Sequence, residues 1–245
     1  MKIVNAVWEK RNIDLDTLEI EVQESDTWED LKSTIGTLHY EYLVVKIPPT
    51  RTDLMFRVNN LGLVFVELIT KAHFSGIQPE LGSLQNRMIN SLEWGEITLK
   101  NKERLFMEIS LGLFKTDRVA IDPSLGTAQS SSRYLGWIAD ELDSGAVIYE
   151  VTKNKELIGF FLMRKIDSHA SEAILAGLLE KYQNSGLGFV LNYFEIELSK
   201  KIGSSSLYST FSSNNRGATA VHMSMGYIVD HQHYVYVKHA PSKVL

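Results

Sequence analysis

The spacing of apolar and polar positions predicts alternating strands and helices along the chain. Two apolar, β-branched runs at 41–47 and 61–70 flank a segment of helical spacing at 50–60, which predicts a strand-helix-strand unit. The stretch 75–104 mixes Gly, Pro and polar residues with weak periodicity, and so predicts a linker. We therefore expect a small α/β domain with its linker at 1–100 and a second domain at 101–245.

The second half of the chain has a clearer pattern. Helical spacing covers 103–114 and 133–142, and 145–166 predicts a hairpin of two strands that turns at "KNKE". An apolar strand at 171–180 leads through a glycine-rich loop into a predicted amphipathic helix at 188–202. The last segments, 205–212, 218–226 and 227–239, predict a strand, a helix and a strand. The predicted fold class is mixed α/β.

Composition narrows the function classes. A chain of 245 residues with 44% hydrophobic content can bury a large core, and its net charge of −5 without a basic stripe argues against nucleic-acid binding. The absence of cysteine excludes thiolate metal sites and cysteine nucleophiles, and we predict no metal. The beginning of the chain lacks the pattern of a signal peptide and no apolar run is long enough to span a bilayer, so we expect a cytoplasmic protein without membrane contact.

The glycine-rich loop has the chemistry of an anion site. A helix that begins in small residues leaves backbone N–H groups unpaired, and the helix dipole adds positive charge at that end. Glycines at 186 and 188 let a diphosphate approach the backbone. The predicted binding residues of the loop are Gln183, Asn184, Ser185, Gly186, Leu187 and Gly188.

The loop alone is weakly specific. A G-x-G triplet is expected roughly once by chance in a chain of this length. Gln183, three residues before the first glycine, and the strand-loop-helix context remove most such accidents. On the loop alone, a turn whose glycines serve only the backbone is an equal alternative.

A second group of residues downstream favours the anion site over the plain turn. Asn215 is followed by Ala218, His222 and Gly226 at +3, +7 and +11. Together with the strand, the Q-x-x-G-x-G loop and the helix, this pattern resembles the GCN5-related N-acetyltransferase superfamily over about 105–240. The resemblance implies that acetyl-CoA or another acyl-CoA is a co-substrate.

The resemblance also implies roles for individual residues. The backbone of Leu178 would contact the acyl and pantetheine region, the amides of 183–188 would hold the pyrophosphate, and Asn215 would hydrogen-bond the pantetheine arm. Splayed parallel strands would leave backbone groups free for the amide arm of CoA. An amine would attack the thioester directly, with the oxyanion held by a backbone N–H near the end of the strand.

At the position of the proton donor, this sequence departs from many members of the superfamily it resembles. Those proteins have tyrosine seven residues after the asparagine. Here the residue is His222, which could protonate the CoA thiolate only if its pKa were raised, because neutral imidazole is a poor acid. A histidine that only packs or hydrogen-bonds near CoA is an equal alternative. Tyr227 and Tyr208 are the other candidate donors.

A narrower resemblance suggests the acceptor. Residues 111–123, Trp137 and the preceding strand-helix-strand unit look like the two-domain dTDP-fucosamine acetyltransferase family, which implies a nucleotide-linked amino deoxysugar as the small-molecule partner. Arg118 would then bind the nucleotide diphosphate, although a structural ion pair with a nearby aspartate is the more common role of such an arginine. Another small amine or a protein amino terminus is an alternative acceptor, and a homodimer is compatible with this architecture.

Two further alternatives stay open. The first domain resembles a degenerate half of the same fold, in which Arg51 stands where the second copy has Asn215, but chance similarity explains this equally well. A non-catalytic acyl-CoA-binding module is the alternative to an enzyme, because the missing tyrosine would then reflect lost chemistry. Release of free CoA in the presence of an amine distinguishes the two.

Overall fold

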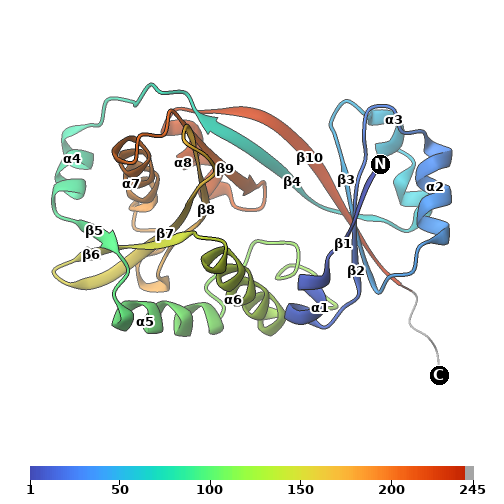
Figure 1. The fold of residues 1–245 in the computed structure, drawn as a ribbon, viewed down its shortest axis with the longest axis horizontal. Coiled ribbons are helices and arrows are strands. Elements are labelled where there is room, and N and C mark those ends of the chain that lie inside the picture. The colour runs from blue at the N-terminus through green and yellow to red at the C-terminus, as the bar shows by residue number, and fades with distance from the viewer. Residues whose placement is uncertain (241–245) are drawn as a thin grey trace. The chain divides into compact units, whose positions relative to one another are not determined.

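The structure, a computed structural model, describes residues 1–240 and has the predicted mixed α/β fold (Figure 1). The chain forms two compact units, one of Met1–Ile69 and the chain from Gln232 onward, the other of Thr70–His231. The chain crosses between them within two long strands, β4 (Val64–Phe74) and β10 (Tyr227–His239). The predicted domain boundary at residue 100 lies within helix α5 (Leu99–Ser110) of the second unit. Whether 1–100 and 101–245 fold as separate domains stays a prediction.

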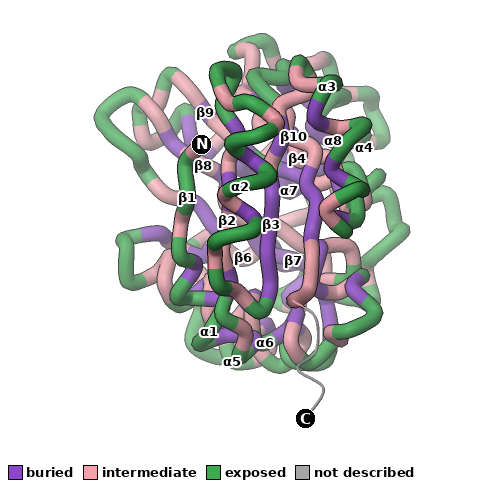
Figure 2. Tube along the Cα trace, turned by 90° about the vertical axis from the view of Figure 1, so that its right-hand side faces the viewer, coloured by how far each residue is buried: buried purple, intermediate pink, exposed green. Residues whose placement is uncertain are grey.

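The first unit is a small sheet with helices. Strand β1 (Lys2–Asn5) pairs antiparallel with β2 (Thr17–Glu21), β2 pairs parallel with β3 (Tyr42–Ile47), and β3 pairs antiparallel with the end of β10. Strand β3 is buried along nearly its whole length (Figure 2) and carries Leu43 and Val45 into the core of this unit. The other elements of the unit are α1 (Val7–Ile13), α2 (Trp28–Thr37), α3 (Thr52–Met55) and a 3-10 helix, η1 (Val58–Leu61).

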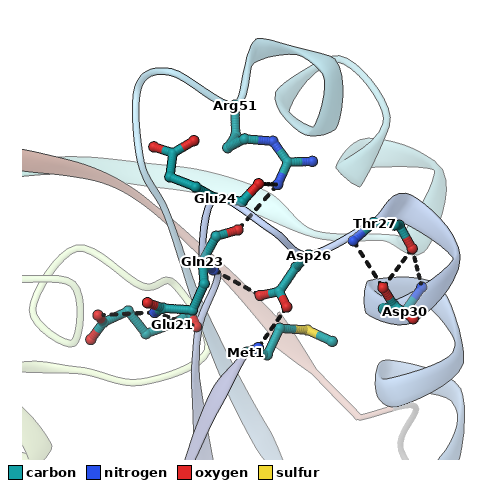
Figure 3. Close-up of polar contacts among 8 residues, drawn as sticks. All are labelled: Met1, Glu21, Gln23, Glu24, Asp26, Thr27, Asp30 and Arg51. Carbon is teal, nitrogen blue, oxygen red and sulfur yellow. Dashed lines mark hydrogen bonds and ion pairs between the residues drawn. The ribbon is translucent and has the colours of Figure 1, made fainter.

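Local polar contacts fix the start of helix α2 and the neighbouring loop (Figure 3). The hydroxyl of Thr27 accepts the backbone N–H of Asp30 at 3.2 Å, and the Asp30 carboxylate accepts the N–H of Thr27 at 2.9 Å, which is a capping box. Arg51 donates to the carbonyls of Gln23 and Glu24 at 3.1 and 3.2 Å. Arg51 therefore holds a turn of its own unit together.

The second unit is a larger mixed sheet with helices on it. Its strand order is β10-β4-β9-β8-β7-β6-β5. Buried side chains of α7 lie in one apolar cluster with residues of β7 and β9, and those of α5 and α6 lie in another. The remaining elements are α4 (Ser83–Asn90), β5 (Glu93–Glu96), α5 (Leu99–Ser110), α6 (Thr127–Asp143), β6 (Val147–Lys153), β7 (Glu156–Lys165), β8 (Ala170–Leu178), the 3-10 helix η2 (Glu180–Tyr182), α7 (Gly188–Lys201), β9 (Ser206–Ser212) and α8 (Arg216–Ser224).

Several predicted elements are confirmed. Strands β6 and β7 form the expected hairpin, which turns through Asn154 and Lys155 at positive φ. Strand β8, helix α7, strand β9, helix α8 and strand β10 follow in the predicted order. Within residues 1–240, no helix combines the length and the apolar character that crossing a membrane requires.

Other expectations are wrong. The predicted linker contains helix α4 and strand β5, whose edge pairing with β6 supplies the stability that its weak local pattern does not show. Helix α7 is not amphipathic, because its own residues are buried on nearly every side of the helix.

Candidate functional site

The glycine-rich loop joins the end of β8 to the start of α7 in a conformation that needs glycine. Gly186 has φ +78°, a left-handed value that other residues rarely adopt, and Asn184 has φ +61°. No atom lies within 4 Å of the position that a Gly186 Cβ would take, so the backbone angle and not crowding requires the glycine. At Gly188, the first residue of α7, an added Cβ would meet only Val221 at 3.5 Å.

The loop leaves backbone donors at the start of α7. The N–H groups of Gln183 and Ser185 donate within the turn, at 3.2 and 3.4 Å, to the carbonyls of Glu180 and Tyr182. Within the described residues, no hydrogen bond joins the N–H groups of 186–188 to a protein acceptor. These three amides, at the positive end of the α7 dipole, could hold an anion. The Ser185 hydroxyl donates to the Tyr182 carbonyl at 2.5 Å, so this side chain is engaged within the loop.

Strands β8 and β9 part before they reach this loop. Their parallel pairing ends at Ala173 and Ser209, whereas β8 continues to Leu178, which pairs only with Gly159 of β7. A bulge at Ile174, where the β7 register shifts, coincides with the point of separation. The edge of β8 that faces β9 thus carries backbone N–H and C=O groups from 174 to 178 that an extended amide chain could pair with.

Asn215 lies at the start of α8, in the connection that follows β9. Its Oδ1 accepts the N–H of Ala218 at 3.0 Å, so the side chain caps the helix. The carboxamide nitrogen is not used by this cap. The residue predicted to bind the pantetheine arm therefore also fixes the beginning of α8.

His222 is buried between α7, α8 and β9. Its Nδ1 is 2.8 Å from the carbonyl of Ala218, which fixes the proton on Nδ1, and Nε2 then accepts from the Ser209 hydroxyl at 2.9 Å. Burial lowers the pKa of His222, and the bond to Ala218 opposes this only in part. The raised pKa that an acid role requires is not present, because desolvation disfavours the imidazolium form.

Tyr227 packs against this imidazole, with ring centroids 4.8 Å apart. Its hydroxyl is buried and has no hydrogen-bond partner within the described residues. Burial, and then the nearby carboxyl of Glu195, raise the pKa of Tyr227 well above its ordinary value. The Tyr227 hydroxyl is therefore a buried donor beside His222 that has no acceptor among residues 1–240.

Sequence reasoning missed a buried pair on α7. The carboxamide of Asn192 donates to the Glu195 carboxylate at 2.6 Å and lies 3.3 Å from Nε2 of His222. Glu195 is only 1% exposed, and burial raises its pKa to about 7, although the bond from Asn192 lowers it. The signal in the sequence was an Asn and a Glu three residues apart in an otherwise apolar run, and charged residues are rarely buried without a partner.

Arg118 lies in the connection between α5 and α6 and is 6% exposed. The neighbouring Asp117 organises this connection by accepting the N–H of Val119 at 2.9 Å and the hydroxyl of Ser130 at 2.8 Å. The role of Arg118 in binding an acceptor stays a prediction.

Comparisons with known proteins address the fold. No protein-family model and no curated protein sequence matches this chain. Among solved structures, a functionally unknown conserved protein from Staphylococcus epidermidis is similar at 11% identity with a TM-score of 0.64, over 92% of this chain and 85% of that one. A GCN5-related N-acetyltransferase from Sphaerobacter thermophilus is similar at 12% identity and a TM-score of 0.63, over 100% and 78% of the two chains.

A third solved structure has a tandem architecture. It is a tandem protein of the GCN5-related N-acetyltransferase type from the clavulanic acid biosynthesis pathway, similar at 10% identity and a TM-score of 0.50, over 82% of this chain and 65% of that one. Identities this low establish the arrangement of elements and not a common activity. The chain has the fold of the GCN5-related N-acetyltransferases.

Proposed function

We propose that this protein is an acyl-CoA-dependent N-acyltransferase of the GCN5-related superfamily, with acetyl-CoA as the first candidate co-substrate. The observation that carries the proposal is the separation of β8 from β9 directly before a glycine-rich helix start. An extended chain of amides ending in a diphosphate matches both features, because the free strand edge offers hydrogen bonds and the helix start offers unpaired N–H groups.

In this arrangement the pyrophosphate lies on the amides of 186–188, with Gln183, Asn184 and Ser185 beside it. The pantetheine arm follows the free edge of β8 from Leu178 toward the bulge at 174, and the carboxamide nitrogen of Asn215 binds the arm from the other side. The acyl group then lies where β8 and β9 separate. These contacts use the amides of 186–188, the free edge of β8 and the carboxamide nitrogen of Asn215, whereas the Ser185 hydroxyl stays bonded to the Tyr182 carbonyl.

The chemistry needs no covalent enzyme intermediate. The neutral acceptor amine attacks the thioester carbonyl, a backbone N–H of β8 holds the oxyanion, and the carbon–sulfur bond breaks to release the CoA thiolate. Tyr227 is a better candidate donor to the thiolate than His222, because His222 is held as a neutral imidazole whose only N–H is bound to Ala218. His222 then acts by holding α8 against β9.

The acceptor proposal is a small-molecule amine, with a nucleotide-linked amino deoxysugar first and Arg118 as its diphosphate ligand. Support for it is the sequence resemblance alone. The neutral state of His222 also favours a second candidate function, a non-catalytic acyl-CoA-binding module that has lost its proton donor. Cytoplasmic location and a homodimer stay part of the proposal.

Calorimetric titration of acetyl-CoA tests the cofactor, with Ser185→Glu as the probe and Ser185→Gln as its neutral control. Ser185 does not have positive φ, so both variants fit the backbone, unlike a substitution at Gly186. We expect binding by the wild type, little change in the glutamine variant, and roughly tenfold or weaker binding in the glutamate variant from repulsion of the pyrophosphate. Absence of binding by the wild type refutes the proposal.

A thiol-release assay then separates enzyme from binding module. Nucleotide-linked amino deoxysugars, other small amines and peptides with free amino termini are offered with acetyl-CoA. An enzyme releases CoA faster with its acceptor, whereas a binding module holds acetyl-CoA and releases none. Arg118→Lys keeps the charge but not the paired donors, so it should weaken only acceptors that carry a diphosphate.

A further inference from the structure

A histidine and an aspartate form a pair on the second unit, in strands next to β9. The Nδ1 atom of His73, on β4, is 2.5 Å from Oδ1 of Asp230, on β10. Because a carboxylate only accepts hydrogen bonds, the proton is on Nδ1 and the lone pair of the neutral ring is on Nε2. The side chain of His73 is 36% exposed, so solvent and small molecules reach this ring.

This pair belongs to a larger group that we name the His73 cluster, made of Lys71, His73, Tyr208 and Asp230. The ring of Tyr208, on β9, lies 6.3 Å from that of His73, and the ammonium of Lys71 lies 5.2 Å from the centre of the Tyr208 ring. Strand β4 is the sheet neighbour of both β9 and β10. All four residues lie within the second unit, so the cluster is defined by one compact body.

The cluster stands beside the point where β8 and β9 separate. Tyr208 pairs with Glu172, one residue before the last pair, Ala173 and Ser209. Successive side chains of a strand point to opposite faces, and Ser209 faces His222 of α8, so Tyr208 faces the other side of the sheet. The proposed acyl group therefore has the His222 group on one face and the His73 cluster on the other.

The surrounding charges favour a neutral amine on this face. Lys71 places an ammonium over the Tyr208 ring, and a fixed positive charge favours the neutral, nucleophilic form of a neighbouring amine. Glu172 is the other carboxylate next to Tyr208, but Arg164 holds it at 2.9 Å and in turn binds Glu141, so this carboxylate is already engaged by a cation. His73 carries the unengaged basic nitrogen of the cluster.

We propose that His73, oriented by Asp230, is the general base of the reaction, and that Tyr208 and His73 form the subsite for the acceptor amine. This inference rests on the proposed acyltransferase function. As the amine nitrogen bonds to the acyl carbon, its N–H proton passes to Nε2 of His73, and the carbon–sulfur bond breaks to release CoA thiolate. Asp230 stabilises the imidazolium, which returns its proton to water through its exposed edge.

The test measures CoA release from acetyl-CoA with glycinamide, a primary amine small enough to fit a subsite made only of His73 and Tyr208. His73→Ala should lower the rate by about 100-fold or more, as loss of a general base does, and added imidazole should restore part of it. Asp230→Asn should lower kcat with little change in the KM for acetyl-CoA, because Asp230 acts through His73. His169→Gln, at an exposed histidine in the turn before β8, is the matched control and should be unchanged.

Calorimetric titration of acetyl-CoA into each variant separates this inference from the proposed function. If the wild type binds acetyl-CoA and His73→Ala transfers at the same rate, or if imidazole restores nothing, the base assignment is wrong while the cofactor proposal stands. A wild type that binds acetyl-CoA but does not accelerate transfer to glycinamide also overturns it. A large loss in Glu172→Gln with none in His73→Ala would assign the base to Glu172.

Discussion

The side chains of His222 and Tyr227 show how burial decides what a residue can do. At position 222 the sequence offered an acid, but the structure holds the imidazole neutral through Ala218 and Ser209. The ring of Tyr227 lies 4.8 Å from that imidazole, measured between centroids, and its buried hydroxyl has no hydrogen-bond partner in the described residues. The spacing from Asn215 predicts a site residue at position 222, but its protonation state depends on neighbours from other elements, which local sequence does not show.

Tyr227→Phe separates the structural and chemical roles of this hydroxyl. Because the oxygen has no protein partner, its removal should leave the free energy of unfolding unchanged or raise it by up to about 1 kcal/mol, measured by urea denaturation. If the hydroxyl serves the leaving thiolate, CoA release should fall at least tenfold. Tyr193→Phe, at a partly buried tyrosine of α7, is the control. Unchanged CoA release in Tyr227→Phe would remove this residue from the chemistry.

Among the elements, helix α7 has a beginning that the sequence predicts and an interior that it does not. Its glycine-rich beginning follows from backbone physics that needs only Gly186 and its neighbours, so this part of the site was predictable. The interior was not, because the helix carries Asn192 and Glu195 into the core and makes contacts on nearly every side. Strand β5 was missed for a similar reason, since pairing with β6 stabilises it more than its own four residues do.

The buried Glu195 gives α7 a pH dependence with a definite sign. Burial raises its pKa from an ordinary 4.5 to about 7, so the folded protein keeps a proton that the unfolded chain releases above about 4.5. The contribution of Glu195 to stability therefore falls as pH rises from about 4.5 to 7, by a total of about 3 kcal/mol. Below about 4.5 both states are protonated and the contribution is constant.

Glu195→Gln should remove this loss, because glutamine accepts the same hydrogen bond from Asn192 without a titrating proton. We expect the stability of the variant relative to wild type to rise between pH 4.5 and 7, as measured by urea denaturation across that range. Glu197→Gln, on the same helix but paired at the surface with Lys200, is the control. Equal pH profiles for wild type and Glu195→Gln would show that the carboxyl is not desolvated in the folded protein.

At the scale of the whole molecule, the sequence does not predict which distant strands pair. Local patterns predicted the order of strands and helices at 41–70 and from residue 103 onward, but the last strand returns to pair with β3, about 190 residues earlier in the chain. A pairing over that separation leaves no local signal in a single sequence. The return of β10 also makes the first unit discontinuous, since it needs both Met1–Ile69 and the residues from 232 onward.

This discontinuity leads to a prediction for a chain that ends at His231. The truncation removes the pairing of β10 with β3 from Tyr234 to His239, and with it the buried side chains of Val235, Tyr236 and Val237. Burial of three such side chains contributes roughly 5–9 kcal/mol, which is comparable to the whole stability of a small domain. We expect residues 1–69 to unfold and to be cut first in limited proteolysis, as mapped by mass spectrometry.

A chain that ends at residue 240 keeps every described pair of β10 and is the control, and it should resist proteolysis like the full chain. Adding a synthetic peptide of residues 232–240 to the shortened protein should restore protection of 1–69, because the peptide can supply the missing strand to β3. A shortened chain that keeps 1–69 resistant without the peptide would show that the first unit holds together without its returning strand.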